Sequence, residues 1–363
     1  MRRPRVLVLP NDRLSIYVRQ GNLSQFIERF EYYADNFCDV YILNVDNAPV
    51  NYEHEGIKII HVEATGVKPF DLLKQVYYSF KYARALDVSF TRALEGSTFI
   101  KAGLLGLASK LAGKKFVCSI HGTYRGLTKT LGYKWYHKLL FRPFEWLAEH
   151  TADVTFVIDP MYIDELKWNN MHLVPNFVDA KLFAPKTAKK KWAGVYVGQL
   201  IERKGISYLV AAAEKIFSKT GEKIAVIGHG PLSSSVRSPA IDYLGSVAHG
   251  KLPFYYNASK LFVTATLHEG FAIPIVESQA CGIPVVATDL PPFHNNTLPG
   301  RTSILVPAKD ANALADAVFS LVKNEPKRRK MGASAREFVL KKFSKESVLT
   351  KEISLIRQTV GVE

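Results

Sequence analysis

The sequence predicts an α/β fold made of two doubly wound domains in tandem. Three observations lead to this fold class. Short β-branched runs alternate with longer segments of helical periodicity, the alternation stops in a segment rich in proline and lysine, and it then starts again. Repeated strand–helix–strand units favour parallel sheets with helices on both faces. The length of 363 residues, 47% of them hydrophobic and 22% charged, suits about two globular domains that each bury a core.

The first half contains short apolar runs that we interpret as strands: residues 5–10, 39–45, 57–62, 87–90, 115–120 and 153–158. Longer helical patterns separate them: residues 23–36, 70–85, 99–113 and 134–150. In the first of these helices, Phe26, Phe30 and Tyr33 form one stripe. The apolar run that follows the basic start of the chain is too short for a signal peptide. No apolar run is long enough to predict a membrane-spanning helix.

Residues 174–192 contain two prolines and a lysine run, which favours an interdomain connection. The alternation then resumes, with strands at residues 193–198, 223–228, 261–266 and 283–288 and helices at 206–218, 311–322, 326–340 and 345–358. We therefore predict domains at 1–180 and 192–344, a linker at about 181–191 and a final helical segment at 345–363. Ligands of such sheets bind at the carboxyl ends of the strands, so we expect a site in a cleft between two facing domains.

The net charge of +15 is uneven, because residues 1–185 hold 23 Lys and Arg against 19 Asp and Glu, and the remainder holds 25 against 14. The basic runs at 189–191, 327–330 and 341–342 have two interpretations. They are solvated helix ends and linker, or they attract a phosphate-rich partner such as a nucleotide or an anionic membrane face. We predict no nucleic-acid partner, because no aromatic–basic binding signature accompanies these runs.

The three cysteines, Cys38, Cys118 and Cys281, are far apart in the chain. No Cys-x-x-Cys pair and no His/Cys ligand spacing occurs, so the cysteines predict buried thiols and no metal site. This usage is typical of a reducing compartment, and we expect a cytoplasmic protein.

A phosphate-binding helix start is the first functional prediction, from the segment 266–290. Pro274 suits the first turn of a helix, and the backbone N–H groups of Gly270, Phe271 and Ala272 before it would be free donors. Glu277 would lie in or just beyond the first turn, where its carboxylate can bind a diol such as a ribose. Glu269 precedes the helix and would point into the cleft. The alternative is that both glutamates merely complement the helix dipole.

A second motif is the Arg203-Lys204-Gly205 triplet, which follows a strand that ends at Gly198 and opens a helix. Two cations at a helix start oppose the helix dipole, so their position is explained if they meet a dianion there. Two exposed surface cations are the alternative. The anion-binding interpretation is stronger because this motif occurs together with the predicted phosphate-binding helix start.

Three weaker features follow strands elsewhere. Gly228 and Gly230 form a Gly-x-Gly turn, for which a plain tight turn is the simpler interpretation. His121 stands at the carboxyl end of a strand, where it either faces a ligand or is structural. Gly21 lies between the first strand and the first helix, where the backbone could approach a substrate.

These motifs, in this order, resemble the retaining glycosyltransferases of family 4. The matching segments are His268–Glu277, which fits the Glu-x7-Glu motif, together with Val174–Asp179, Val197–Gly205, Ile227–Leu232 and Ser119–Thr123. The resemblance covers nearly the whole chain and is strongest from Val174 to Val322. It implies the GT-B fold, with an acceptor-side first domain, a nucleotide-sugar-binding second domain and a last helix that crosses back to the first.

The resemblance also implies the roles of single residues. Arg203 and Lys204 would hold the donor diphosphate, and Glu277 the ribose. Glu269 would hold hydroxyls of the donor sugar together with the backbone at Gly270 and Phe271. His121 would lie near the reacting sugar, and Gly21 would let its loop approach the diphosphate.

The sequence departs from the family pattern at three positions. Gln199 stands where an arginine is usual, Asn22 replaces the second glycine of a pair, and Phe177 replaces a turn glycine. The chain has no Asp-x-Asp pair to hold a metal, so we expect metal-independent transfer with no cofactor other than the nucleotide-diphosphate sugar as donor. Retention by a front-face route, with Glu269 not acting as a nucleophile, is what the resemblance implies.

Other functions remain open at this stage. A sugar-nucleotide epimerase, a phosphorolytic enzyme or a non-catalytic sugar-nucleotide-binding subunit would use the same phosphate site. The acceptor would be a glycan or a lipid-linked hydroxyl. The aromatic and basic segment Tyr133–Trp146 either contacts an anionic membrane or is a helix packed on the sheet and kinked at Pro143. Residue types identify neither the base, the sugar nor the acceptor.

Overall fold

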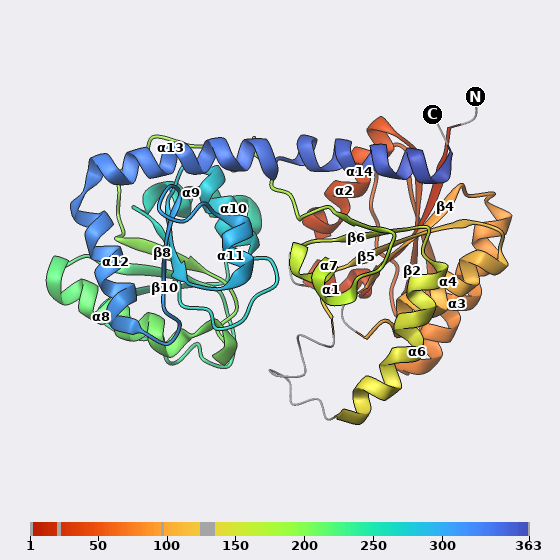
Figure 1. Ribbon diagram of the computed structural model, residues 1–363, viewed down its shortest axis with the longest axis horizontal. Coiled ribbons are helices and arrows are strands. Elements are labelled where there is room, and N and C mark those ends of the chain that lie inside the picture. The colour runs from red at the N-terminus through yellow and green to blue at the C-terminus, as the bar shows by residue number, and fades with distance from the viewer. Residues whose placement is uncertain (1–2, 20–22, 96–97, 124–134, 362–363) are drawn as a thin grey trace. The chain divides into compact units, whose positions relative to one another are not determined.

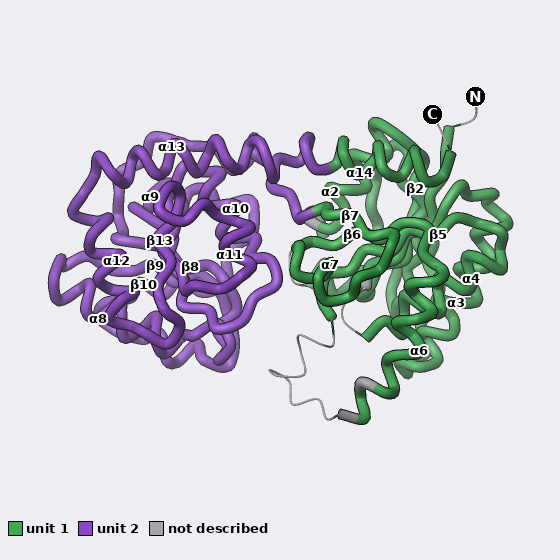
Figure 2. The backbone as a smooth tube through the Cα atoms, viewed as in Figure 1, with its two compact units in different colours: residues 1–174, 349–363 green, residues 175–348 purple. Residues whose placement is uncertain are grey.

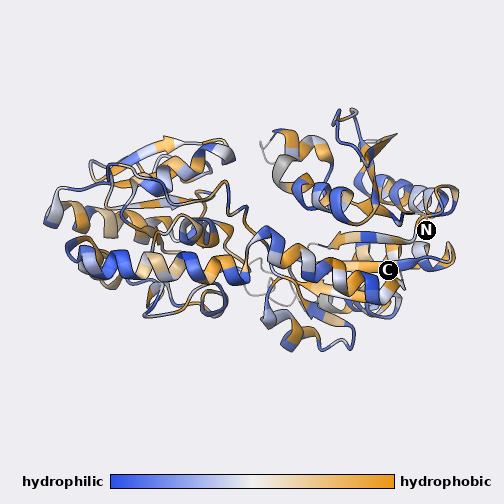
Figure 3. Ribbon diagram, turned by 90° about the horizontal axis from the view of Figure 1, so that it is seen from above, coloured by the Kyte–Doolittle hydropathy of each residue, from blue (hydrophilic) through white to orange (hydrophobic). Residues whose placement is uncertain are grey.

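The computed structural model describes residues 3–19, 23–95, 98–123 and 135–361 (Figure 1). The chain divides into two compact units: unit 1 consists of residues 1–174 and 349–363, and unit 2 of residues 175–348 (Figure 2). Each unit has its own parallel sheet, which confirms the predicted doubly wound α/β class. In Figure 3 the helices show both apolar and polar colours along their length, as expected for helices with one buried face.

Unit 1 is built on a sheet with the strand order β3-β2-β1-β4-β5-β6-β7. Its strands are β1 (Arg5–Leu9), β2 (Asp39–Asp46), β3 (Ile57–Glu63), β4 (Phe90–Glu95), β5 (Lys115–Ile120), β6 (Val154–Val157) and β7 (Met171–Leu173). Its helices are α1 (Leu14–Arg19), α2 (Leu23–Asn36), α3 (Lys68–Ala85), α4 (Ile100–Leu111), α6 (Trp135–Thr151) and α7 (Pro160–Leu166). The neighbours β1 and β4 are the point at which the strand order reverses.

Unit 2 is built on a second sheet with the order β10-β9-β8-β11-β12-β13. Its strands are β8 (Gly194–Val197), β9 (Ile224–Ile227), β10 (Ile241–Gly245), β11 (Phe262–Thr264), β12 (Val285–Thr288) and β13 (Ser303–Val306). Its helices are α8 (Ile206–Thr220), α9 (Leu252–Ala258), α10 (Ile273–Ala280), α11 (Pro291–Asn296), α12 (Ala311–Lys323) and α13 (Glu325–Lys342), with 3-10 turns η1 (Glu202–Lys204) and η2 (His249–Lys251). The strand order reverses between β8 and β11, which is where ligands of such sheets bind.

The last helix, α14 (Lys345–Val360), begins in unit 2, and its residues from Leu349 onward belong to unit 1. The division at Val174 precedes the predicted linker at 181–191. That segment belongs to unit 2 because it is bonded to it: the Lys186 N–H donates to Asn257 Oδ1 at 2.8 Å, and the Lys191 N–H to the carbonyl of Ala258 at 2.7 Å.

Two predicted elements differ in detail. The strand expected at 87–90 is β4, and it begins only at Phe90. Asp87 has a left-handed φ of 47°, and the Val88 N–H bonds back to the carbonyl of Ala83, so these residues end α3. The helix predicted at 206–218 begins at Ile206 as expected, but Arg203 and Lys204 lie in the 3-10 turn η1 before it rather than in its opening turn. The sequence patterns did not predict α1, α7, α9, α11, β7, β10 or β13, most of which are short.

Candidate functional site

The candidate site lies in unit 2, at the carboxyl ends of β8 and β11. Arg203 and Lys204 are both in η1, directly after β8. Gly205 ends this turn with φ +65°, and a Cβ built on it would overlap the carbonyl oxygen of Ala265, so glycine is required there. The Leu267 N–H donates to the carbonyl of Arg203 at 2.8 Å. The loop after β11 therefore fixes the turn that carries both cations.

Glu269 forms an ion pair with Lys204, and its other oxygen lies 3.9 Å from a guanidinium nitrogen of Arg203. The Lys204 and Glu269 side chains are 17% and 12% exposed, whereas that of Arg203 is 41% exposed. The cations predicted to meet a dianion thus already have one carboxylate between them. One positive charge remains in excess, and it is best placed on the more exposed Arg203.

The start of α10 lies beside this ion pair. Pro274 occupies the first turn as predicted, and no side chain caps the N-terminus. Lys204, Glu269, Ala272 and Pro274 together line a cavity of about 20 Å³, which is about the size of one water molecule. Among the described interactions, none uses the backbone N–H groups of Gly270 to Ile273. These donors and the excess positive charge form a suitable anion site.

Glu277 is the fifth residue of α10 and is only 2% exposed. The Tyr256 hydroxyl donates to its Oε2 at 2.8 Å, and His249 Nε2 lies 2.6 Å from its Oε1, which fits an Nε2–H donor. Sequence reasoning missed both partners. Burial, followed by the charge of Glu277, raises the pKa of Tyr256 well above its usual value. Glu277 therefore anchors α9 and η2 to α10, and each carboxylate oxygen retains one further acceptor position.

The site glycines permit close backbone contact between two loops. A Cβ built on Gly228 would overlap the carbonyl oxygen of Gly198, and one on Gly230 would overlap the carbonyl of Leu200. Leu200 also donates its N–H to the carbonyl of His229 at 3.0 Å. Contact between the loops after β8 and β9 is sufficient to explain these glycines, whether or not a phosphate lies beside them.

The two predicted site residues of unit 1 have different outcomes. Gly21, like Asn22, lies outside the described residues. His121 directly follows β5, and part of its surface is exposed to solvent. Neighbouring protein atoms nevertheless desolvate its ring, which disfavours the charged form. Desolvation, followed by the charges of Arg29 and Arg92, lowers its pKa to about 4. His121 is therefore neutral at physiological pH and can accept or donate a hydrogen bond.

A buried ionic cluster near His121 was not predicted. Glu352 of α14 forms ion pairs with Arg29 of α2 and Arg92 of β4, and it accepts a hydrogen bond from Tyr33 at 2.7 Å. Glu352 is 0% exposed and Arg92 1%. The sequence held one signal for this cluster: in α14, Glu352 lies among apolar residues on the stripe that packs into the core. The cluster holds the end of the chain on unit 1.

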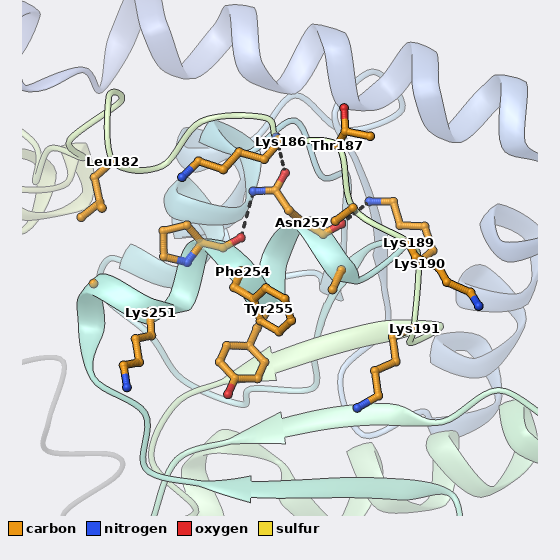
Figure 4. Close-up of a pocket in the computed structure, with 14 residues that line it drawn as sticks. Leu182, Lys186, Thr187, Lys189, Lys190, Lys191, Lys251, Phe254, Tyr255 and Asn257 are labelled. Atoms are coloured by element: carbon orange, nitrogen blue, oxygen red, sulfur yellow. Dashed lines mark hydrogen bonds between the residues drawn. The ribbon is translucent and has the colours of Figure 1, made fainter.

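The lysine run of the second half lines an open pocket of about 870 Å³ in unit 2 (Figure 4). Its members Lys190 and Lys191 have partners of their own. Lys190 donates to the carbonyls of Asn257 and Ser259, both at 2.8 Å, and Lys191 lies 3.8 Å from a carboxylate oxygen of Asp242. Two of the three lysines at 189–191 are therefore explained by contacts within unit 2, which favours the interpretation of this run as linker.

All three cysteines are buried and free, as predicted. Among the described residues, no group of three or more His, Cys, Asp or Glu side chains is placed to hold a metal ion. None of the helices in the described ranges combines the length and apolarity that a membrane span needs.

The amino-acid sequence is similar to a family model and to several known proteins. Residues 193–324 match the family model "Glycosyl transferases group 1". The phosphatidyl-myo-inositol mannosyltransferase of Mycobacterium leprae is 32% identical over 202 residues, which are 52% of this chain and 53% of that protein. The capsular polysaccharide biosynthesis glycosyltransferase CapM of Staphylococcus aureus is 29% identical over 162 residues, 42% of each chain. The match thus spans about half the length of these curated relatives.

A solved structure supports the fold over the full length. The Anabaena protein HepE in complex with UDP superimposes with a TM-score of 0.75 at 13% sequence identity, covering 98% of this chain and 100% of the other. At this identity the likeness concerns the fold alone.

Proposed function

We propose that this chain, whose residues 193–324 match the family model "Glycosyl transferases group 1", transfers a sugar from a nucleotide-diphosphate sugar to a hydroxyl group. The proposed acceptor is a glycan or a lipid-linked sugar. Transfer would proceed with retention and without a metal ion. The proposed location is the cytoplasm, at the face of an anionic membrane.

One observation carries this proposal: Arg203, Lys204 and the start of α10 meet around a single carboxylate, that of Glu269. A nucleoside diphosphate gains negative charge as the bond to the sugar breaks. Fixed cations and free backbone N–H groups in a partly buried site stabilise that charge without reorganising. Two cations against one carboxylate leave the positive excess that this step needs.

The geometry also supports a front-face route. Both oxygens of Glu269 face cations, and such a carboxylate is a poor nucleophile, so a covalent glycosyl–Glu269 intermediate is disfavoured. In the proposed step, the bond from the anomeric carbon to the diphosphate oxygen breaks. The acceptor oxygen bonds to the same face of that carbon, and its proton goes to the leaving phosphate. Glu269 would set the position of Lys204 in addition to its proposed contact with sugar hydroxyls.

The related proteins support the choice of donor and acceptor. HepE is described in complex with UDP, and the Mycobacterium leprae relative is named for a phosphatidyl-myo-inositol acceptor. By analogy we propose a nucleoside diphosphate in the site of unit 2 and a lipid-linked or glycan acceptor. The neutral His121 of unit 1 would contact the reacting sugar as a hydrogen-bonding group, and Glu277 would use a remaining acceptor position for the ribose.

The test is a calorimetric binding series with UDP, GDP, ADP and their sugar conjugates on wild type and Lys204→Ala. We expect one nucleoside diphosphate to bind and the variant to bind it about 10- to 100-fold more weakly, because a charge-assisted contact is lost. Lys260→Ala is the matched control. Lys260 is 19% exposed and also pairs with a glutamate, Glu222, in the same unit, but it lies outside the site.

Equal nucleotide affinity in wild type and Lys204→Ala would refute the phosphate role. Incubation of a bound sugar nucleotide without acceptor separates the other functions. An epimerase converts the sugar and releases no nucleoside diphosphate, whereas a transferase releases diphosphate slowly and accelerates when an acceptor is added. Binding without either reaction would favour a non-catalytic subunit.

A further inference from the structure

Helix α3 of unit 1 has an inverted distribution of polar and apolar residues. Its buried residues are small or polar: Asp71, Gln75, Ser79 and Ala83. Phe70, Leu73 and Tyr77 are 58%, 58% and 59% exposed, and their spacing places them on one outward stripe. The inward polar groups have partners within unit 1, since Asp71 pairs with Arg13 and Gln75 donates to the carbonyl of Pro10. The apolar stripe is therefore the outer face of a helix that is fixed in place.

Two neighbouring helices extend this apolar surface. Helix α4 packs against both α3 and α6, and the three are drawn side by side in Figure 1. On α4, Leu111 is 68% exposed. On α6, Leu139 and Trp146 are 69% and 58% exposed, while Phe141 faces the interior at 7%. The interpretation of α6 as a packed helix is confirmed for its inner face, and its outer face keeps apolar side chains exposed. We call the exposed residues of these helices the α3–α4–α6 face.

The exposed charges on this face are predominantly basic. The exposed charged residues that the structure describes on these helices are all basic: Lys68, Lys81, Arg84, Lys110 and Arg142. Of the acidic residues described on these helices, Asp71 and Glu145 are buried and Glu149 is half-buried, and Asp153 just after α6 pairs with Lys110 at 2.7 Å, so the exposed surface keeps a positive excess. Apolar and aromatic side chains among cations match a partner that is anionic at its surface and apolar beneath.

We propose that the α3–α4–α6 face docks unit 1 on the surface of an anionic lipid bilayer. Phe70, Leu73, Tyr77 and Trp146 would enter the headgroup region, while the lysines and arginines contact lipid phosphates. A second copy of the chain fits less well. A two-fold interface would set the same patch of each copy against the other and bring like charges together. This inference deepens the membrane part of the proposed function, and its test is independent of sugar transfer.

The experiment measures cosedimentation of the full chain with vesicles of phosphatidylcholine alone or mixed with phosphatidylglycerol. We expect binding to the anionic vesicles that weakens with added salt. Phe70→Ser with Tyr77→Ser should lower the partition coefficient at least about tenfold, because two aromatic side chains no longer insert. Lys81→Gln with Arg84→Gln should lower it roughly 25-fold, at about fivefold for each removed charge.

Matched controls come from unit 2. Phe254→Ser removes an aromatic side chain that is 61% exposed and lies beside the lysine-lined pocket of Figure 4. Lys327→Gln with Lys330→Gln makes the same change of net charge on α13. Both controls should bind vesicles as the wild type does. Thermal unfolding of every variant verifies that the fold is kept.

Three outcomes would overturn the proposal. In the first, the wild type fails to bind anionic vesicles at low salt. In the second, the unit 2 control variants lose vesicle binding as strongly as the α3 variants do. In the third, light scattering shows a wild-type dimer that Phe70→Ser with Tyr77→Ser converts to a monomer, which would assign the face to self-association. Nucleotide binding by the same preparations shows separately whether the donor site is intact, so failure of the docking surface is distinguishable from failure of the proposed transferase function.

Discussion

Replacing Glu352 with glutamine is expected to destabilise unit 1 by about 3–5 kcal/mol, the usual cost of removing one partner from a buried ion pair. The magnitude follows from burial: Glu352 is 0% exposed, Arg92 is 1% exposed and the Arg29 side chain is 13% exposed. The variant keeps the shape of the side chain and one hydrogen-bond acceptor for Tyr33. It removes the charge that both guanidinium groups face, so the loss measures electrostatics rather than packing.

The assay is equilibrium denaturation, followed by limited proteolysis near the C-terminus. Loss of the cluster should release the end of α14 and expose it to cleavage before unit 2 unfolds. Glu346→Gln is the matched control on the same helix. Glu346 lies 3.9 Å from Lys181, the two side chains are 51% and 88% exposed, and its replacement should cost under ~1 kcal/mol. If Glu352→Gln costs no more than this control, the cluster does not hold the helix as we argue.

The same variant has a predicted pH dependence. Burial by itself would raise the pKa of Glu352, but the charges of Arg29 and Arg92 and the bonds from Tyr33 and Arg92 outweigh burial and lower it. A carboxyl group with a lowered folded-state pKa stabilises the fold above its unfolded-state pKa and loses that contribution as pH falls through the folded-state value. The stability gap between wild type and Glu352→Gln should therefore be largest near neutral pH and shrink in acid.

Three further predictions concern single residues. Gly228→Ala should cost about 2–4 kcal/mol in thermal denaturation, because its Cβ would overlap the Gly198 carbonyl at a φ of 140°. His121 should titrate near pH 4 by NMR, well below an ordinary histidine, because desolvation, followed by the charges of Arg29 and Arg92, disfavours the imidazolium. Tyr256→Phe should cost about 1–3 kcal/mol, since a buried oxygen of Glu277 loses its 2.8 Å donor.

Controls for these three predictions are available in the same chain. Gly250→Ala should be nearly neutral, because nothing lies within 4 Å of the Cβ position and its φ is ordinary. His121→Gln identifies the histidine resonance, and a midpoint near 6.5 would contradict the argument from desolvation and charge. Tyr255→Phe, next to Tyr256 in α9, should keep wild-type stability. An equal loss in both tyrosine variants would mean that the hydrogen bond to Glu277 is not the cause.

The buried strands were predicted well because both faces of a parallel sheet are covered, which leaves near-continuous apolar runs such as residues 115–120. The strand expected at 87–90 was misplaced by several residues, because Asp87 and Val88 close the preceding helix and Arg92 interrupts the apolar run of β4. A buried arginine is excluded by pattern rules, yet Arg92 is stable in β4 because its counter-charge arrives from α14.

The sequence by itself determined the fold class and the helix start at Pro274, because these follow from local periodicity and from the chemistry of neighbouring residues. It also predicted an anion-binding role for Arg203 and Lys204. Only the tertiary structure decided which groups meet. Glu269 pairs with Lys204, Glu277 is closed in by Tyr256, and Glu352 reaches Arg92. Each of these pairs joins residues that are 21 to 260 positions apart. No local pattern encodes such distances, because chain folding rather than spacing brings the charges together.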